Sequence, residues 1–153
     1  MKIKSKGDKS LDILTKKEVE QVQKFLAKET PLTVFKNHLE ELCFFPQALK
    51  REFQFICQGL YKYHVGTPMG TFKHNKLIPH HALALSNLIG PTFPTLELNK
   101  EQAVSFLRKE TLPVSEAMGQ GWHLMQYNGL NLGWGKVLKD RINNYFPKHL
   151  RIR

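Results

Sequence analysis

The feature that most restricts the fold of this sequence is the pair Asn128-Gly129, which stands between two runs of extended character, residues 122–127 and 130–136. A two-residue type I′ turn needs a positive φ at both central positions, and Asn-Gly is among the pairs best suited to it. The sequence therefore predicts a β-hairpin here. A two-residue turn also sets which residues face each other across the strands: Tyr127 and Leu130, Met125 and Leu132, His123 and Trp134, Trp122 and Gly135.

The size and composition of the chain are those of a small globular protein. It has 153 residues, of which 41% are hydrophobic and 24% are charged, enough for one ordinary domain or two very small ones. No apolar run approaches the roughly 18 residues of a membrane span. The lysine-rich start is not followed by the apolar segment of a secretory signal. We therefore expect neither a membrane protein nor a secreted one, and we place the chain in the cytoplasm.

The charge of the chain indicates its class of partner. Lysine and arginine number 23 against 13 aspartate and glutamate residues, so the formal net charge is +10 and the pI is about 9.7. An excess of this size on a small protein produces a positive field that attracts polyanions. Nucleic acid is the first expectation, and an anionic membrane surface is the second.

The chain divides at a proline-containing break near residues 90–96. Residues 1–13 are basic and have little to bury, which is typical of a tail or linker. Residues 14–90 are expected to form an N-terminal α/β subdomain that begins with a helix capped by Thr15. Residues 95–153 are expected to form a second subdomain, in which Asn99 caps a helix before the hairpin. The predicted fold class is α+β.

Four further predictions rest on residue types alone. The helix after Thr15 is expected to continue to about residue 28. Residues 35–42 suit a short helix, and residues 53–56 suit a strand because they are rich in aromatic side chains. A helix is expected from about residue 79, where a proline is tolerated in the first turn, to about residue 90.

The residues that most often carry catalysis or metal binding do not form a recognisable site. Cys43 and Cys57 are expected to be buried free thiols, and no CxxC pair is present for zinc. His74, His80 and His81 do not have the spacing of a helical zinc site, so we expect no metal. The sequence has no GxSxG, GxGxxG or GxxxxGK[ST] motif, so we assign no catalytic residue.

The C-terminal segment has the composition of a nucleic-acid-binding surface. Residues 136–153 hold six lysines and arginines against one aspartate, interleaved with Tyr145, Phe146 and His149. Cations neutralise phosphates, and flat rings offer stacking surfaces to unpaired bases. Charge density alone leaves a second interpretation open, in which the edge is merely solvated and both aromatic rings belong to the core.

Five separate pieces of the sequence together form a recognisable pattern. They are residues 78–84 (IPHHALA), 106–110 (FLRKE), 121–129 (GWHLMQYNG), 132–136 (LGWGK) and 143–151 (NNYFPKHLR). In order and spacing these pieces resemble the C-terminal part of bacterial Sun-family rRNA cytosine-5 methyltransferases, and the resemblance covers about Phe35 to Arg153. Two departures from the family pattern are His149 in place of a glycine and Asn143 in place of a lysine.

Enzymes of this family end in a PUA-like RNA-binding domain, so the resemblance implies that residues 95–153 form a PUA-like β-barrel with a flanking helix. It also implies binding to rRNA, with phosphates held by the basic strands and bases held by the aromatic rings. Charge and resemblance together give the candidate RNA-binding residues: Trp134, Lys136, Lys139, Arg141, Asn144, Tyr145, Lys148, Arg151 and Arg153.

The catalytic part of such an enzyme is not recognisable here. The family needs a glycine-rich loop for S-adenosylmethionine and a nucleophilic cysteine that follows proline, whereas Cys43 follows Leu42 and Cys57 follows Ile56. We therefore expect a recognition module that binds no cofactor itself, with S-adenosylmethionine and a methyltransferase catalytic domain supplied by the parent enzyme. The alternatives are an autonomous protein that binds nucleic acid or an acidic protein, and a histidine-based hydrolase.

Overall fold

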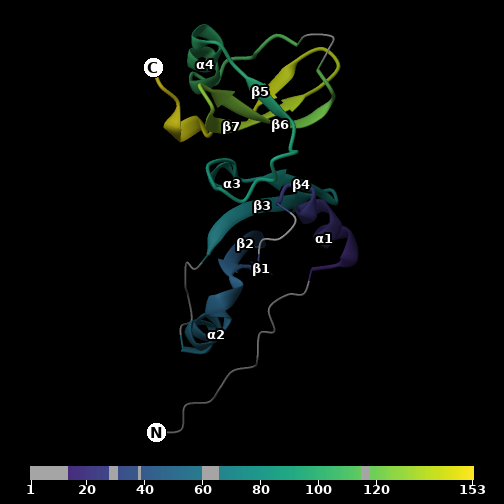
Figure 1. Cartoon of the computed structure of the whole chain (residues 1–153), viewed down its shortest axis with the longest axis vertical. Helices are drawn as coiled ribbons and strands as arrows, with labels where there is room; N and C mark the ends of the chain where they lie inside the picture. Colours follow the sequence, from purple (N-terminus) through teal and green to yellow (C-terminus); the bar gives the residue numbers. More distant parts are fainter. Residues whose placement is uncertain (1–13, 28–30, 38, 60–65, 115–117) are drawn as a thin grey trace, which may run out of the picture.

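The computed structural model describes residues 14–27, 31–37, 39–59, 66–114 and 118–153. Within these ranges, the first half holds a meander of four strands and three helices, and the second half holds four strands with one helix beside them (Figure 1). The elements are α1 (Lys16–Gln23), β1 (Leu32–Lys36), β2 (Glu41–Pro46), a 3₁₀ turn (Gln47–Leu49), α2 (Lys50–Gly59), β3 (Thr67–Lys73), β4 (Lys76–Pro79), α3 (His81–Ala84), β5 (Thr95–Glu97), α4 (Lys100–Leu107), β6 (Gly121–Tyr127), β7 (Leu130–Val137), β8 (Ile142–Asn144) and a second 3₁₀ turn (Lys148–Leu150).

Two four-stranded sheets carry the fold, one with the order β1-β2-β3-β4 and one with the order β5-β6-β7-β8. All neighbours are antiparallel except β5 and β6, which are parallel. Figure 1 shows the second sheet at the top of the view, the first sheet in the middle, and α3 between them. The predicted α+β class is confirmed. The second sheet is open among the described residues, because β5 and β8 are its edges and are not paired with each other.

Both predicted helix caps are present. The hydroxyl of Thr15 accepts from the backbone N–H of Glu18, and the carboxylate of Glu18 accepts from the backbone N–H of Thr15, so two exposed donors of the first turn are satisfied. Asn99 and Gln102 form the same box at the start of α4. However, α1 ends at Gln23 rather than near residue 28, because residues 25–27 leave the helix and pair with residues 88–90.

Three predictions for the middle of the chain are wrong. In place of a helix over residues 35–42, the chain has the end of β1 and the start of β2, which pair as a hairpin. The Asn37 side chain accepts from the N–H groups of Leu39 and Glu41 and stabilises the connection between the two strands. Residues 53–56 lie in α2, since the preceding residues 50–52 are good helix formers. The helix expected at residues 79–90 is only α3, because Leu88 turns back to accept a hydrogen bond from Ala27.

The β6–β7 hairpin is confirmed, but its register is corrected. Tyr127 pairs with Leu130 as expected, whereas Met125 pairs with Gly133, because a β-bulge at Leu132 adds one residue to β7. The φ of Gly133 is +152°, which favours glycine at this irregular position. Every pair beyond the bulge is shifted by one residue: Leu124 with Trp134, His123 with Gly135, and Trp122 with Lys136.

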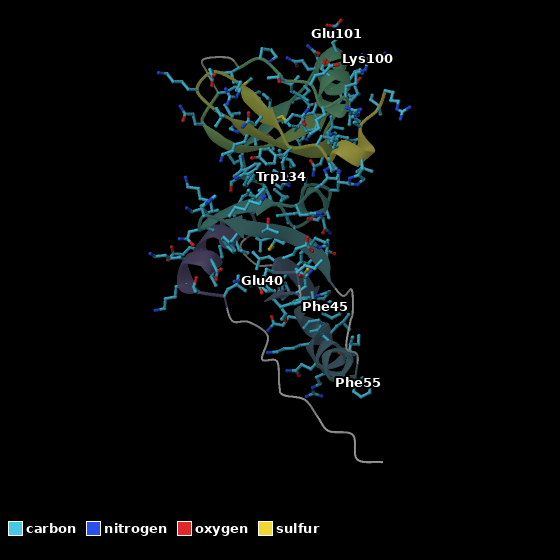
Figure 2. All side chains as sticks on the ribbon, turned by 180° about the vertical axis from the view of Figure 1, so that it is seen from behind. Glu40, Phe45, Phe55, Lys100, Glu101 and Trp134 are labelled. Atoms are coloured by element: carbon cyan, nitrogen blue, oxygen red, sulfur yellow. The ribbon has the colours of Figure 1, made fainter. Side chains whose placement is uncertain are left out.

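The bulge determines which core each face of the hairpin enters. Met125 and Val137 face the interior of the second sheet and pack with Phe106 of α4. Leu124 and Trp134 face the other way and join a cluster with Leu83 and other residues of the first half. The two halves therefore share a hydrophobic core across the hairpin. Figure 2 places Trp134 at the junction between the halves.

None of the helices in the described ranges is long and apolar enough to cross a bilayer. The boundaries proposed at residues 13, 90 and 95 stay a prediction. The first sheet ends at Pro79 and the second begins at Thr95. The predicted division near residues 90–95 therefore lies in the segment that joins the two sheets.

Candidate nucleic-acid interface

Most of the predicted basic residues lie at the surface. Arg141 forms an ion pair with Asp140 at 3.2 Å, and the two side chains remain 55% and 70% exposed, respectively. Such a pair is too weakly held to prevent an arginine from meeting a phosphate. The other exposed cations of the segment make no ion pair with any described residue: Lys139, Lys148, Arg151 and Arg153.

Lys136 and Tyr145 each contact the indole of Trp122. The Lys136 ammonium lies 5.4 Å from the centroid of the Trp122 ring, and the Tyr145 ring meets the same indole edge-on at 4.5 Å. Trp122 pairs with Lys136 across β6 and β7, so the strand register brings them together. Sequence reasoning missed Trp122 because it treated the C-terminal segment alone. The signal was the hairpin itself, which places the start of β6 beside the end of β7.

The C-terminal segment is held against α4 by Lys109. The Lys109 ammonium donates to the backbone oxygens of Asn144 and Phe146, and the N–H of Ile152 donates to the oxygen of Leu107 at 3.2 Å. Burial lowers the pKa of Lys109 from its ordinary value, and the nearby charge of Lys148 lowers it further. Figure 1 shows the C-terminus beside α4. These contacts fix the basic segment before any ligand arrives.

Two of the predicted residues have structural partners instead of a free side chain. Trp134 is 1% exposed, and its indole N–H donates to the oxygen of His80 at 2.9 Å. It is a core residue, so we leave it out of the RNA surface. The Asn144 amide donates to the oxygens of Phe106 and Glu110, and its own oxygen accepts from Phe146. Its side chain therefore joins β8 to the end of α4.

The histidines have roles that packing explains. The Nδ1 atom of His80 accepts from the N–H of Ala82 and caps α3. His81 packs edge-on against Phe146, and burial followed by the proximity of His80 and His149 lowers its pKa below the ordinary value. Within the described ranges, no group of three or more histidine, cysteine or acidic residues is arranged to hold a metal ion.

Cys43, the cysteine of the first half whose side chain is described, does not have the environment of a nucleophile. Cys43 is free and buried at 3% exposure, and it packs with Phe35 and Phe53. Burial raises the pKa of its thiol, and nearby Glu41 raises it further, which is the reverse of what a nucleophilic thiolate needs. The burial expected for Cys43 is confirmed, whereas the side chain of Cys57 lies outside the described residues.

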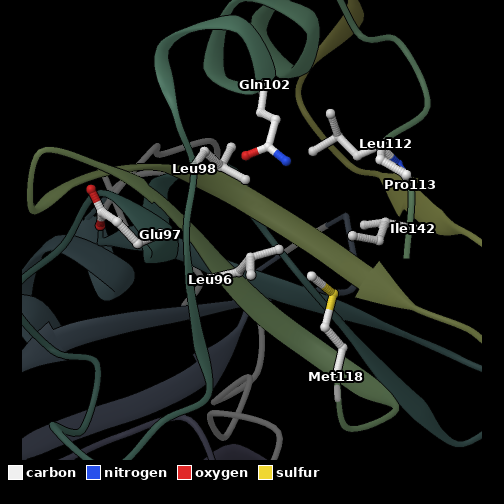
Figure 3. Close-up of a pocket in the computed structure, with 8 residues that line it drawn as sticks. All are labelled: Leu96, Glu97, Leu98, Gln102, Leu112, Pro113, Met118 and Ile142. Carbon is white, nitrogen blue, oxygen red and sulfur yellow. The ribbon is translucent and has the colours of Figure 1, made fainter. Parts of the chain in front are cut away.

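A small cavity of about 110 Å³ lies inside the second half, between β5, α4 and β8 (Figure 3). Gln102 points toward it, but its side-chain oxygen already accepts from the N–H of Asn99 in the capping box. Figure 3 shows Glu97 turned away from the other lining side chains. Ligand pockets have volumes of roughly 300–1,000 Å³, so this cavity is a packing gap. Its other lining residues are Leu96, Leu98, Leu112, Pro113, Met118 and Ile142.

Comparison with known families finds a similarity in the second half. Residues 93–152 match the family model described as the methyltransferase RsmF PUA domain, a span that runs from just before β5 to the C-terminal 3₁₀ turn and beyond. No curated protein matches the chain. The part of the family resemblance that covers residues 35–92 lies outside this match and stays a prediction. Residues 93–152 are therefore similar to the PUA domain of the methyltransferase RsmF.

Proposed function

We propose that this protein binds ribosomal RNA through its PUA domain and serves as the recognition part of an rRNA cytosine-5 methyltransferase. The observation that carries the proposal is the family match over residues 93–152, on the same part of the chain that bears the exposed cations. A net charge of +10 favours a polyanion as partner. An rRNA substrate would place the protein in the cytoplasm.

The geometry supports two separate roles, phosphate binding by exposed cations and base stacking by aromatic rings. Lys139, Arg141, Lys148, Arg151 and Arg153 are exposed and can reach phosphates, which fixes the position of the RNA without reading its sequence. On the hairpin, the rings of Trp122 and Tyr145 lie together beside the Lys136 ammonium. Rings and a cation in one place suit an unpaired base and its phosphate.

Methyl transfer itself would be carried out elsewhere. Two observations support this proposal: no glycine-rich cofactor motif is recognisable in the sequence, and burial raises the pKa of the Cys43 thiol. We propose that S-adenosylmethionine binds to a methyltransferase catalytic domain of the parent enzyme, and that this chain supplies the RNA contacts. The alternatives, an acidic protein as partner and a histidine-based hydrolase, find no specific support in the described geometry.

The experiment is a titration of a fluorescently labelled rRNA hairpin by fluorescence anisotropy at several salt concentrations. Phosphate binding releases counterions, so the logarithm of affinity should fall linearly with the logarithm of salt, by roughly 0.7–0.9 per phosphate contact. A polyglutamate peptide of similar charge is the control for an acidic protein partner. Affinity for the peptide equal to that for the RNA would contradict the proposal, as would the absence of RNA binding at low salt.

A further inference from the structure

A hollow of about 310 Å³ lies where the two halves meet, and we call it the junction groove. This volume is at the lower end of the roughly 300–1,000 Å³ of ligand pockets. Its walls come from the end of α1, from the segment that joins α3 to β5, and from the start of β6. The lining residues that matter here are Lys24, Phe25, Thr92, Phe93, Gln120 and Trp122.

The backbone on the first-half side of the groove is held by hydrogen bonds between the end of α1 and the segment after α3. Gly90 donates to the oxygen of Phe25 at 3.1 Å, and Ala27 donates to the oxygen of Leu88 at 2.9 Å. Phe93 donates to the oxygen of Gly90 at 3.0 Å, which closes a turn in the joining segment. The groove is therefore formed in the absence of a ligand, so binding there need not be offset by the cost of ordering these segments.

Aromatic rings form the apolar side of the groove and are supported from behind. Phe93 stacks on buried Phe25 with a centroid distance of 5.1 Å and meets buried Trp134 edge-on at 5.4 Å. Trp122 meets Trp134 edge-on at 6.5 Å. Phe93 and Trp122 are only partly buried. They can offer ring surface to a ligand while the rings behind them keep their orientation.

The polar side of the groove is cationic and neutral, with no acidic residue in its lining. Lys24 lines the groove and is exposed just after the end of α1. Lys136 is outside the lining but beside it, since its ammonium lies 5.4 Å from the centroid of the Trp122 ring. Thr92 and Gln120 add neutral hydrogen-bonding groups. An apolar protein segment laid here would desolvate the ammonium groups without pairing them, which is costly. A ligand that joins a flat ring to an anionic group would stack on the aromatic side of the groove and pair with the ammonium groups on its polar side.

We propose that the junction groove binds one unpaired RNA nucleotide, with its base against Trp122 and Phe93 and its phosphate between Lys24 and Lys136. This inference rests on the proposed RNA-binding function and adds to it a contact from the first half of the chain, outside the PUA domain. Trp122 also touches Tyr145, so the groove continues the proposed RNA surface of the second half. A fully paired duplex cannot place a base in the groove.

The first test uses the intrinsic fluorescence of the protein. The chain has two tryptophans, and Trp134 is 1% exposed, so a change of emission on contact with a base reports on Trp122. A single-stranded oligoribonucleotide should quench this emission, and a paired RNA duplex of the same length should not. Trp122→Phe keeps an aromatic ring for packing and should abolish the quenching. Loss of the stacking contact in Trp122→Leu should weaken single-strand binding roughly 5- to 150-fold.

The second test compares Lys24, which follows the last residue of α1, with Lys17 in the first turn of α1, by fluorescence anisotropy with the same oligoribonucleotide. Lys24→Ala should weaken binding and flatten the salt slope by roughly 0.7, the value for one phosphate contact on a single strand. Lys17→Ala removes the same charge from the exposed start of the helix and should leave the slope unchanged. Neither lysine is buried, so both variants should fold. The comparison of Lys24→Ala with Lys17→Ala therefore tests the inference even if Trp122→Leu does not fold.

The outcomes separate this inference from the proposed function. If the parent protein binds RNA with a normal salt slope, but emission is unchanged and Lys24→Ala equals Lys17→Ala, the groove inference is wrong and the proposed function stands. If the parent binds no RNA, both are wrong. If an acidic peptide changes the emission and RNA does not, the groove takes a protein segment and the inference is again wrong.

Discussion

The indole N–H of Trp134 donates to the backbone oxygen of His80 at 2.9 Å and so joins the second sheet to the first half of the chain. The Asn131 amide makes a parallel connection to the oxygen of Ala84 at 2.9 Å. Both donors belong to β7, and both acceptors lie at the short helix α3. Since the hydrophobic core also crosses this junction, the two halves are expected to unfold together.

Trp134→Phe should therefore destabilise the whole chain. The substitution leaves the His80 oxygen without its donor and opens a cavity among Phe25, Phe93 and Leu124. These effects together should cost at least about 2 kcal/mol of unfolding free energy. Thermal unfolding followed by circular dichroism measures the change. Phe55→Ala removes an exposed ring of α2 (78% exposed; Figure 2) and should stay within about 0.5 kcal/mol of the parent. An equal shift in both variants would contradict the assignment of Trp134 to the shared core.

The hairpin turn gives a second prediction. Asn128 and Gly129 have φ angles of +50° and +74°, as the type I′ assignment requires. Gly129→Val should cost more than about 1 kcal/mol, because a β-branched residue resists a positive φ. Gly119→Val is a matched control, since a side chain at either glycine meets nothing within 4 Å and only Gly129 has a positive φ. Urea unfolding of both variants separates backbone strain from crowding.

The sequence could predict elements whose signal is local. The Asn128-Gly129 turn and the capping boxes at Thr15 and Asn99 depend on residues within a few positions of one another, and all three are present. The hairpin register could not be predicted, because it depends on a bulge at Leu132 that serves packing on both faces of β7. Tertiary contacts decide such irregularities, not the turn.

The surroundings of the candidate site residues could not be predicted for the same reason. Trp134 and Tyr145 look alike in sequence, as aromatic residues near lysines, yet one is buried at the junction and the other is partly exposed. Lys24 and Trp122 could not be connected from the sequence, since they come together only when the end of α1 meets the start of β6. A site between two halves of a chain is invisible to reasoning that treats each segment alone.

The pKa of His81 predicts a pH dependence of stability. Burial, then the nearby His80 and His149, lowers this pKa below its unfolded value, so the folded protein disfavours the protonated ring. The stabilisation is fully present above about pH 6.5 and is lost as pH falls through the folded pKa. When the pH is lowered from about 7.5 to about 5.5, the Tm of His81→Gln should therefore fall by less than the Tm of the parent. His74→Asn, at an exposed turn with φ +48°, should follow the parent. Identical pH profiles for parent and His81→Gln would contradict this prediction.

The proposed division between recognition and catalysis predicts that this chain does not bind S-adenosylmethionine. Donor binding needs a glycine-rich loop, and covalent catalysis needs an accessible thiolate, whereas Cys43 is buried with a raised pKa. Isothermal titration calorimetry of the chain with S-adenosylmethionine should show no heat of binding. Micromolar affinity would mean that the chain carries a cofactor site of its own and would overturn the proposed role.

The basic C-terminal surface gives the prediction that bears most directly on function. Lys148 and Arg151 are exposed, flank the second 3₁₀ turn and make no ion pair with a described residue. If both contact phosphates, Lys148→Ala with Arg151→Ala should weaken RNA binding uniformly across sequences and flatten the salt slope by roughly 1.4–1.8. Fluorescence anisotropy on several rRNA hairpins measures both effects.

The matched control for that double variant is Lys16→Ala with Lys17→Ala, which removes the same charge from the exposed first turn of α1. Both double variants lower the net charge of the whole protein from +10 to the same value, so any effect of general charge on RNA affinity should appear equally in the two. Only a local phosphate contact can flatten the slope in the C-terminal variant alone. Equal slopes in the two double variants would place the RNA surface elsewhere on the molecule, even if the parent binds RNA tightly.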